Sequence, residues 1–169
     1  MARCNPLVAG IARACAERGW YALRFNFRSV GASAGTWTGG REEADDIGAA
    51  VAHAQIIAPT LPVGLVGYSF GALMSLRWAS RSRGGRVDAL VLVGLPLRSV
   101  TGRDNDLPPV PDGTFIVAAE NDQFGTATEL RERFPRARIG EIRGADHFFV
   151  GYRDELQRLV TEELARTLG

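Results

Sequence analysis

The sequence contains no lysine, and only two cysteines and two histidines occur among its 169 residues. All 20 basic residues are therefore arginines, and with 19 acidic residues they leave a formal net charge of +1. A balance this close to neutral gives no electrostatic basis for binding nucleic acid or an anionic membrane. No apolar run approaches the roughly eighteen residues of a membrane span, and the first residues do not follow the pattern of a secretory leader. We expect a soluble, cytoplasmic protein.

The scarcity of cysteine also limits the possible cofactors. Cys4 and Cys15 are too few for a disulfide framework or a zinc site, so both are expected to be small apolar or surface residues in a reducing compartment. The glycines of residues 31–35 lack the lysine and the spacing of a phosphate-binding loop. The sequence thus predicts no cofactor and no metal.

Strand and helix patterns alternate along the whole chain, whose length fits one domain of residues 1–169. The predicted strands cover residues 20–27, 63–67, 87–94, 114–119 and 138–142. The predicted helices begin at Pro6, Arg41, Phe70, Gly125 and about Val150, and the third ends near Arg83. Apolar strands between amphipathic helices indicate an α/β fold: a doubly wound, mostly parallel sheet with helices on both faces.

The pentapeptide Gly-Tyr-Ser-Phe-Gly at residues 67–71 is the most informative motif. It joins a short apolar strand to a helix, which is the context of a nucleophile elbow, and its alternative is an ordinary glycine-containing turn. In an elbow, Ser69 is held in a strained backbone geometry with its hydroxyl clear of the sheet, and glycines two residues away on each side avoid Cβ clashes. The amide of Phe70 then opens the helix as a candidate oxyanion donor.

A nucleophilic serine needs a histidine as base and a carboxylate that orients the histidine. His147 lies between the last strand and the last helix, on the same sheet edge as Ser69, whereas His53 lies inside a helix and is expected to be a solvated or boundary side chain. Asp122 follows a strand at the position expected for the acid, with Glu120 as its competitor. The alternative role for Asp122 is a turn or helix cap, and Asp146 is expected to turn the backbone locally.

Four segments, at residues 24–35, 67–71, 120–122 and 144–149, resemble the α/β-hydrolase superfamily, and more narrowly its small bacterial dienelactone-hydrolase-like group. The resemblance implies Ser69 as nucleophile, Asp122 as orienting acid and His147 as base. It further implies cleavage of a small-molecule carboxylic ester or thioester through an acyl-enzyme. Ser29 departs from the group, which usually has glycine there.

Proteins of this kind open with additional strands and a loop that supplies the second oxyanion donor, whereas here a helix is predicted almost at Met1. The absent third strand would lie between those matching residues 20–27 and 63–67. Either these two strands pair directly, or the natural protein begins upstream and this chain is N-terminally truncated. Only these two outcomes are acceptable, because unpaired central backbone groups are costly, and of the two we expect the second.

The proline- and aspartate-rich connection between Gly94 and Thr114 is too short for a cap domain, so the site is expected to be open and shallow. Tyr68, Phe124 and Phe148 are the candidates to line it, although aromatic residues at these positions serve equally well in a core. Two rival functions share these features: a non-catalytic binding protein on the same scaffold, and an enzyme that transfers the acyl group to an acceptor other than water. Self-association into a homo-oligomer is left open.

Overall fold

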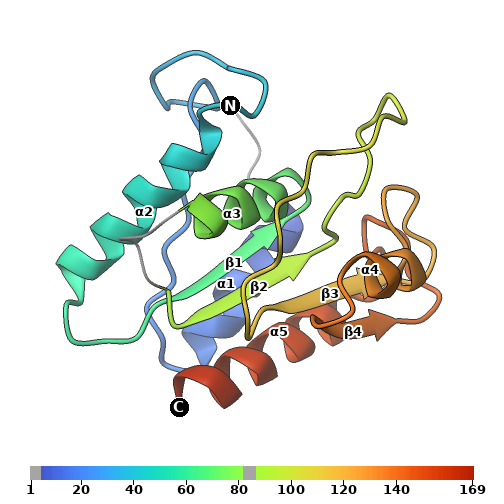
Figure 1. Ribbon diagram of the computed structural model, residues 1–169. Coiled ribbons are helices and arrows are strands. Elements are labelled where there is room, and N and C mark those ends of the chain that lie inside the picture. Colours follow the sequence, from blue (N-terminus) through green and yellow to red (C-terminus); the bar gives the residue numbers. More distant parts are fainter. Residues whose placement is uncertain (1–4, 82–86) are drawn as a thin grey trace.

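The computed structural model describes residues 5–81 and 87–169, in which four strands and five helices are found (Figure 1). The strands are β1 (Gly64–Tyr68), β2 (Ala89–Val93), β3 (Phe115–Ala119) and β4 (Arg138–Ile142). The helices are α1 (Pro6–Glu17), α2 (Glu43–Ile57), α3 (Phe70–Arg81), α4 (Ala127–Arg133) and α5 (Arg153–Leu168). The predicted elements are confirmed with one exception. Cys4 and the predicted helix end near Arg83 lie outside the described residues.

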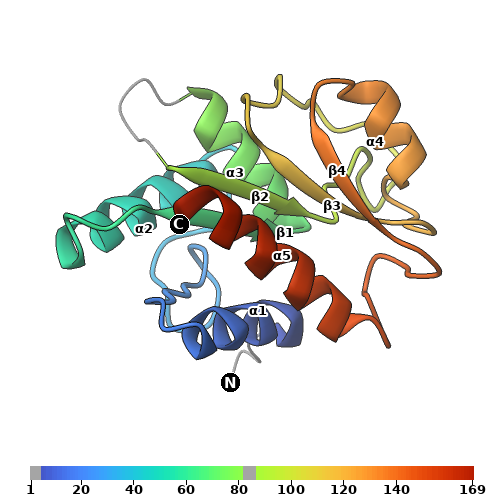
Figure 2. The same cartoon turned by 90° about the horizontal axis from the view of Figure 1, so that it is seen from below.

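The four strands form one parallel sheet in the order β1-β2-β3-β4. Helices α2, α3 and α4 cover one face, and α1 and α5 lie together on the other (Figures 1 and 2). Every residue of β2 and β3 is buried, because side chains on both faces of these central strands meet helices. The doubly wound α/β fold with helices on both faces is therefore confirmed.

Alternation along the strands divides the core into two layers. Leu92 and Ile116 point toward α2, α3 and α4, where Met74 and Leu76 are fully buried. The intervening strand residues point toward α1 and α5 and pack with Leu156 and other side chains. Each layer fixes its helices against the sheet, so the loops at the carboxyl ends of the strands have a rigid base.

Residues 20–27 do not form the predicted strand, which is a correction. The two ends of this segment contact opposite sides of the core, since Phe27 packs on the α2–α3 side and Trp20 on the α1–α5 side, and residues 21–26 between them are exposed. No backbone ladder pairs it with another strand among the described residues, and β1 forms the edge of the sheet. The direct pairing with residues 63–67 is therefore also wrong. Alternating side chains are a local property, whereas a ladder requires a neighbouring backbone.

The end of the same segment is fastened to α2. The backbone N–H of Arg28 donates to Asp46 over 2.9 Å, and its guanidinium pairs with Asp46 and Glu42. These hydrogen bonds, chiefly those from the Arg28 side chain, lower the pKa of Asp46 against the opposing effect of burial. The start of the loop that follows Arg28 is therefore held against α2.

The connection from β2 to β3 contains no helix within residues 94–114, all of which are described, and its only pairing there is an isolated bridge between Arg98 and Asp104. The expected absence of a cap domain at this place agrees with the structure. None of the helices in the described part of the chain is long and apolar enough to cross a membrane.

Candidate active site

Ser69 occupies a sharp turn between β1 and α3. Its φ is 54°, in the left-handed region that non-glycine residues rarely adopt. A Cβ added at Gly67 would lie 2.5 Å from the carbonyl oxygen of Gly71, so the turn can close only with glycine at position 67. A Cβ at Gly71 would meet none of the described atoms within 4 Å, so the expected steric role holds for Gly67 and is wrong for Gly71.

His147 and Asp122 complete a hydrogen-bonded chain that begins at Ser69. Ser69 Oγ lies 2.8 Å from His147 Nε2, and His147 Nδ1 lies 2.8 Å from Asp122 Oδ2. His147 and Asp122 are 3% and 1% exposed, whereas Ser69 is partly exposed. A buried carboxylate that accepts from Nδ1 leaves Nε2 free to accept the serine proton. The structure therefore brings together the three residues that the sequence singled out.

Asp122 also satisfies the alternative prediction that it caps a turn. Its Oδ1 accepts from the backbone N–H of Phe124 over 2.8 Å, while Oδ2 faces His147. The competitor Glu120 instead accepts from the amide of Gly144 over 2.7 Å. Both carboxylates thus belong to the site, but only Asp122 contacts the imidazole; Glu120 steadies the loop that carries His147.

The loop that presents His147 is shaped locally. Asp146 Oδ1 accepts from the backbone N–H of Phe148 over 2.9 Å, which is the turn predicted for this aspartate. Phe149 follows with a φ of 50° and a fully buried ring that anchors the loop in the core. The other histidine, His53, lies on α2 and is exposed, as predicted.

Three aromatic rings surround the His147 imidazole. Tyr68 stacks on it with centroids 5.5 Å apart, and Phe124 and Phe148 approach edge-on at 4.7 and 5.6 Å. Phe148 is 55% exposed, whereas the Tyr68 hydroxyl is turned inward and donates to the carbonyl oxygen of His147 over 3.0 Å. Tyr68 is thus a support of the histidine loop, while Phe148 is the most open of the three.

Phe70 is the first residue of α3. The amides of the first helical turn have no acceptor within their helix, and the helix dipole places partial positive charge at this end. An oxygen that gains negative charge beside Ser69 would therefore meet a favourable field. The ring of Phe70 contacts Phe27 and Trp37.

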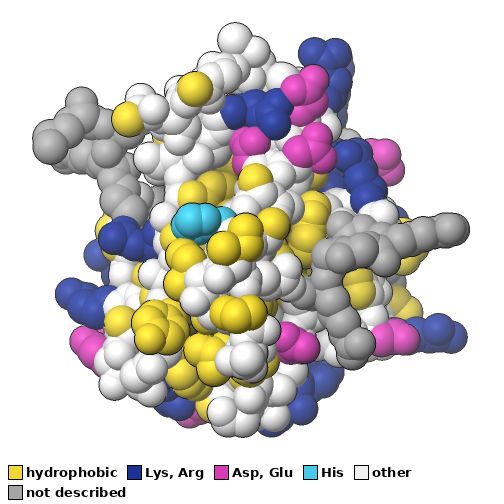
Figure 3. Space-filling view, turned by 90° about the vertical axis from the view of Figure 1, so that its left-hand side faces the viewer, with side chains coloured by type: hydrophobic (Ala, Val, Ile, Leu, Met, Phe, Trp, Pro, Cys, Tyr) yellow, Lys and Arg dark blue, Asp and Glu magenta, His cyan; other side chains and the backbone are white. Residues whose placement is uncertain are grey.

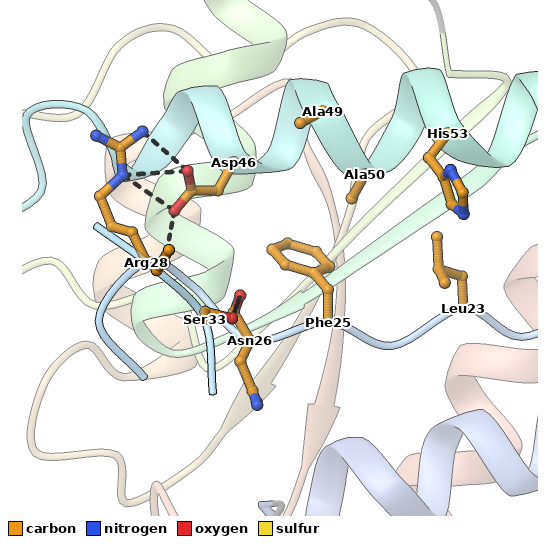
Figure 4. Close-up of a pocket in the computed structure, with 10 residues that line it drawn as sticks. Leu23, Phe25, Asn26, Arg28, Ser33, Asp46, Ala49, Ala50 and His53 are labelled. Atoms are coloured by element: carbon orange, nitrogen blue, oxygen red, sulfur yellow. Dashed lines mark hydrogen bonds and ion pairs between the residues drawn. The ribbon is translucent and has the colours of Figure 1, made fainter. Parts of the chain in front are cut away.

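A cavity of about 320 Å³ lies elsewhere, between residues 23–34 and α2. Figure 4 shows Leu23 and Phe25 extending toward Ala50 and His53, with the Arg28–Asp46 pair at one end. Hydrophobic side chains also gather on the side of the molecule where α2 lies (Figure 3). Neither Ser69 nor His147 lines this cavity, so it is separate from the hydrogen-bonded chain.

Two residues near the elbow were not among the sequence candidates, namely Trp37 and Glu43. Trp37 contacts Phe70, and the Glu43 carboxylate is fully buried under the loop after Trp37. Nothing in an acidic run before a helix distinguishes a buried glutamate from a solvated one, so no sequence signal identified it. No group of three or more metal-ligating side chains is positioned to hold an ion among residues 5–81 and 87–169.

Comparisons with known proteins relate the fold to a family. A family model described as an alpha/beta hydrolase domain matches residues 2–166. A lidless α/β serine hydrolase from Xanthomonas campestris superimposes with a TM-score of 0.83 at 29% identity, over 97% of this chain and 74% of that one. An α/β serine hydrolase homologue from Coxiella burnetii gives 0.79 at 27% identity, over 95% and 76%. An uncharacterized protein of Rickettsia prowazekii is 28% identical over 95% of this chain and 71% of its own length.

Proposed function

The chain belongs to the alpha/beta hydrolase family, and from that premise we propose that it is a serine hydrolase that cleaves carboxylic esters or thioesters through an acyl-enzyme. The observation that carries the proposal is the pair of 2.8 Å contacts that link Ser69 to His147 and His147 to Asp122. The family and the serine hydrolase neighbours support a hydrolase, and the contacts support these three residues as the reacting ones.

In the proposed first step, Ser69 Oγ attacks the carbonyl carbon of the substrate while its proton passes to His147 Nε2. The negative charge moves to the carbonyl oxygen, where the Phe70 amide at the start of α3 stabilises it. The bond to the leaving oxygen or sulfur then breaks, and His147 Nε2–H protonates that atom. The acyl group remains as an ester on Ser69.

In the second step, water attacks the acyl-Ser69 carbonyl and His147 takes the proton of the water. The bond between Ser69 Oγ and the acyl carbonyl carbon then breaks, His147 returns the proton to Ser69 Oγ, and the acyl group is released as a carboxylic acid. Asp122 stabilises the imidazolium that forms in each half-reaction, because its Oδ2 accepts from Nδ1. The connection at residues 94–114 carries no helical cap, so we propose that the substrate reaches Ser69 from an open surface.

Active-site labelling tests this proposal. We expect a fluorophosphonate probe to modify the purified chain once, at Ser69, as located by peptide mass spectrometry. Ser69→Ala should abolish labelling and lower the hydrolysis of p-nitrophenyl acetate by a factor on the order of 10⁶. Ser75→Ala is the matched control, because Ser75 is a fully buried serine of α3. A folded wild-type protein that neither labels nor hydrolyses the ester would contradict the proposal.

Acyl transfer to another acceptor uses the same three residues and needs a separate measurement. Product analysis in the presence of added methanol distinguishes the two reactions. A hydrolase should give mainly the free acid, whereas a transferase should give mainly the methyl ester even at low methanol concentration.

A further inference from the structure

A row of four aromatic rings begins beside the nucleophile. The ring of Phe70, the residue after Ser69, lies 5.0 Å from Trp37 and 5.2 Å from Phe27. Phe27 in turn lies 5.3 Å from Phe25. Trp37 is 56% exposed and Phe25 is 39% exposed, so the row presents ring surface to solvent. Contiguous exposed apolar surface on a folded protein often marks a binding site.

The loop that carries Trp37 is held by a buried charge. The Glu43 carboxylate accepts from Thr38 N at 2.7 Å, from Thr38 Oγ1 at 2.6 Å and from Gly40 N at 2.8 Å. Burial opposes ionisation of Glu43, but these donors prevail and lower its pKa to about 2. Arg77 of α3 also donates to the Gly40 carbonyl over 3.0 Å. The chain is thus fixed immediately after Trp37.

Gly40 brings this loop against the start of α3. Its φ is +86°, and a Cβ placed there would meet the side chains of Arg77, Met74 and Phe70 at 3.2 to 3.7 Å. The close approach of the backbone therefore favours glycine at this position. As a result, the placement of Trp37 over Phe70 is determined by the loop backbone as well as by the ring contact.

The proposed reaction assigns different sides of the site to the two halves of the ester. His147 Nε2 must reach the leaving oxygen or sulfur to protonate it, so the leaving group lies on the side of the imidazole. The rings of Phe124 and Phe148 contact that imidazole. Phe70 directly follows Ser69 in the chain, and its ring contacts Trp37.

We infer that the Phe70–Trp37 face binds the acyl group, that Trp37 selects flat, uncharged aromatic acyl groups, and that Glu43 positions Trp37. Aromatic rings favour offset or edge-to-face contacts with other rings, which a short alkyl chain does not make. This inference rests on the proposed function and names its substrate class.

Two series of esters separate acyl selection from leaving-group selection. The acyl series compares p-nitrophenyl benzoate with p-nitrophenyl acetate, and the leaving-group series compares 2-naphthyl acetate with p-nitrophenyl acetate. Trp37→Ala should lower kcat/KM for the benzoate by about tenfold, mainly through KM, and change the acetate by less than about twofold. The leaving-group ratio should not change. Trp37→Phe should restore most of the benzoate activity.

Tyr21→Ala is the matched control for the loss of an exposed ring, because Tyr21 is 83% exposed on residues 20–27 and lies outside the row. Glu43→Gln places an amide against the backbone donors of Thr38 and Gly40, so it should reproduce the benzoate-specific rise in KM with kcat nearly kept. Glu42→Gln is its control, because the exposed Glu42 side chain pairs with Arg28, whereas only its backbone N–H contacts the loop, at Thr38 Oγ1. If Glu43→Gln fails to fold, the Trp37 variants alone decide.

The outcomes separate this inference from the function on which it rests. If the wild type is labelled at Ser69 and hydrolyses these esters, but Trp37→Ala leaves the benzoate-to-acetate ratio unchanged, only this inference is overturned. If Trp37→Ala changes the leaving-group ratio instead, the two sides have been assigned wrongly. If the wild type neither labels nor hydrolyses any ester, the proposed function fails and the inference fails with it.

Discussion

Tyr68 contacts His147 at two points. Its ring stacks on the imidazole at a centroid distance of 5.5 Å, and its hydroxyl donates over 3.0 Å to the carbonyl oxygen of the same histidine. Tyr68 is the last residue of β1 and directly precedes Ser69. The strand that presents the serine therefore also holds the loop that presents the histidine, which ties together two residues 78 positions apart in the sequence.

Removing that hydroxyl while keeping the ring should loosen the histidine loop. We expect Tyr68→Phe to lower kcat/KM for p-nitrophenyl acetate roughly three- to tenfold, because one buried hydrogen bond contributes about 1 kcal/mol. Burial, with the nearby charges of Asp122 and Asp146, raises the pKa of Tyr68 to about 12. The hydroxyl thus stays a donor below pH ~10. A wild-type-to-variant activity ratio that varies strongly between pH 6 and 9 would argue against this role.

Asp122→Asn should cost far more than the equivalent change at Glu120. An amide nitrogen facing Nδ1 stabilises the tautomer with the proton on Nε2, which cannot accept from Ser69. We expect kcat to fall about 10³- to 10⁴-fold, by the general logic of such triads. Glu120→Gln retains an acceptor for Gly144 and should keep kcat within about threefold. Equal losses in the two variants, measured by ester hydrolysis, would refute the assignment of Asp122.

The two glycines of the elbow should respond differently to alanine. Gly67→Ala places a Cβ 2.5 Å from a backbone oxygen and should lower the free energy of unfolding by about 3 kcal/mol or more. Gly71→Ala meets open space in α3 and should be neutral or stabilising by up to about 1 kcal/mol, because alanine favours the helix. Chemical denaturation of both variants measures these changes. A more stable Gly67→Ala protein would mean that the turn differs from the one described.

Glu43 should make the stability of the fold depend on acid pH. Its pKa is about 2 in the folded protein against an ordinary value of 4.5, so the folded state binds this proton less readily than the unfolded state. The stabilisation is therefore fully present above pH 4.5 and is lost as the pH falls toward 2. Thermal unfolding between these values should show a steeper fall in Tm for the wild type than for Glu43→Gln. Parallel curves would rule out Glu43 as the source.

The helices and the buried strands follow from local sequence patterns. The Asn5 side chain accepts from the Leu7 amide at the start of α1, and Thr126 and Glu129 form a capping box at the start of α4. These signals span only a few residues, so they can be read without knowledge of the fold. The same is true of the elbow, because the glycine at position 67 and the serine at position 69 are neighbours.

Residues 20–27 show that a local sequence pattern does not suffice to predict a paired strand. Their alternating pattern matches a strand, yet they have no ladder partner among the described residues. The sequence likewise did not predict the roles of Tyr68 and Glu43, because each role depends on a hydrogen bond to a backbone group that the sequence does not identify. Alternation and helix capping depend on residues that are close in the sequence. Strand pairing and the hydrogen bonding of buried polar groups depend instead on which distant segments come into contact.

By itself, the sequence determined the order of the helices and of every predicted strand except residues 20–27, the elbow at Ser69, and the identities of Asp122 and His147 as candidates at strand ends. Only the tertiary structure decided that Asp122 rather than Glu120 contacts the histidine, and that Tyr68 supports it. It also decided that Trp37 contacts Phe70 and that Glu43 accepts from the loop after Trp37. The physical reason is the range of the forces involved. Backbone propensities act between neighbours, whereas a hydrogen bond or ring contact requires separate segments to converge within a few ångströms.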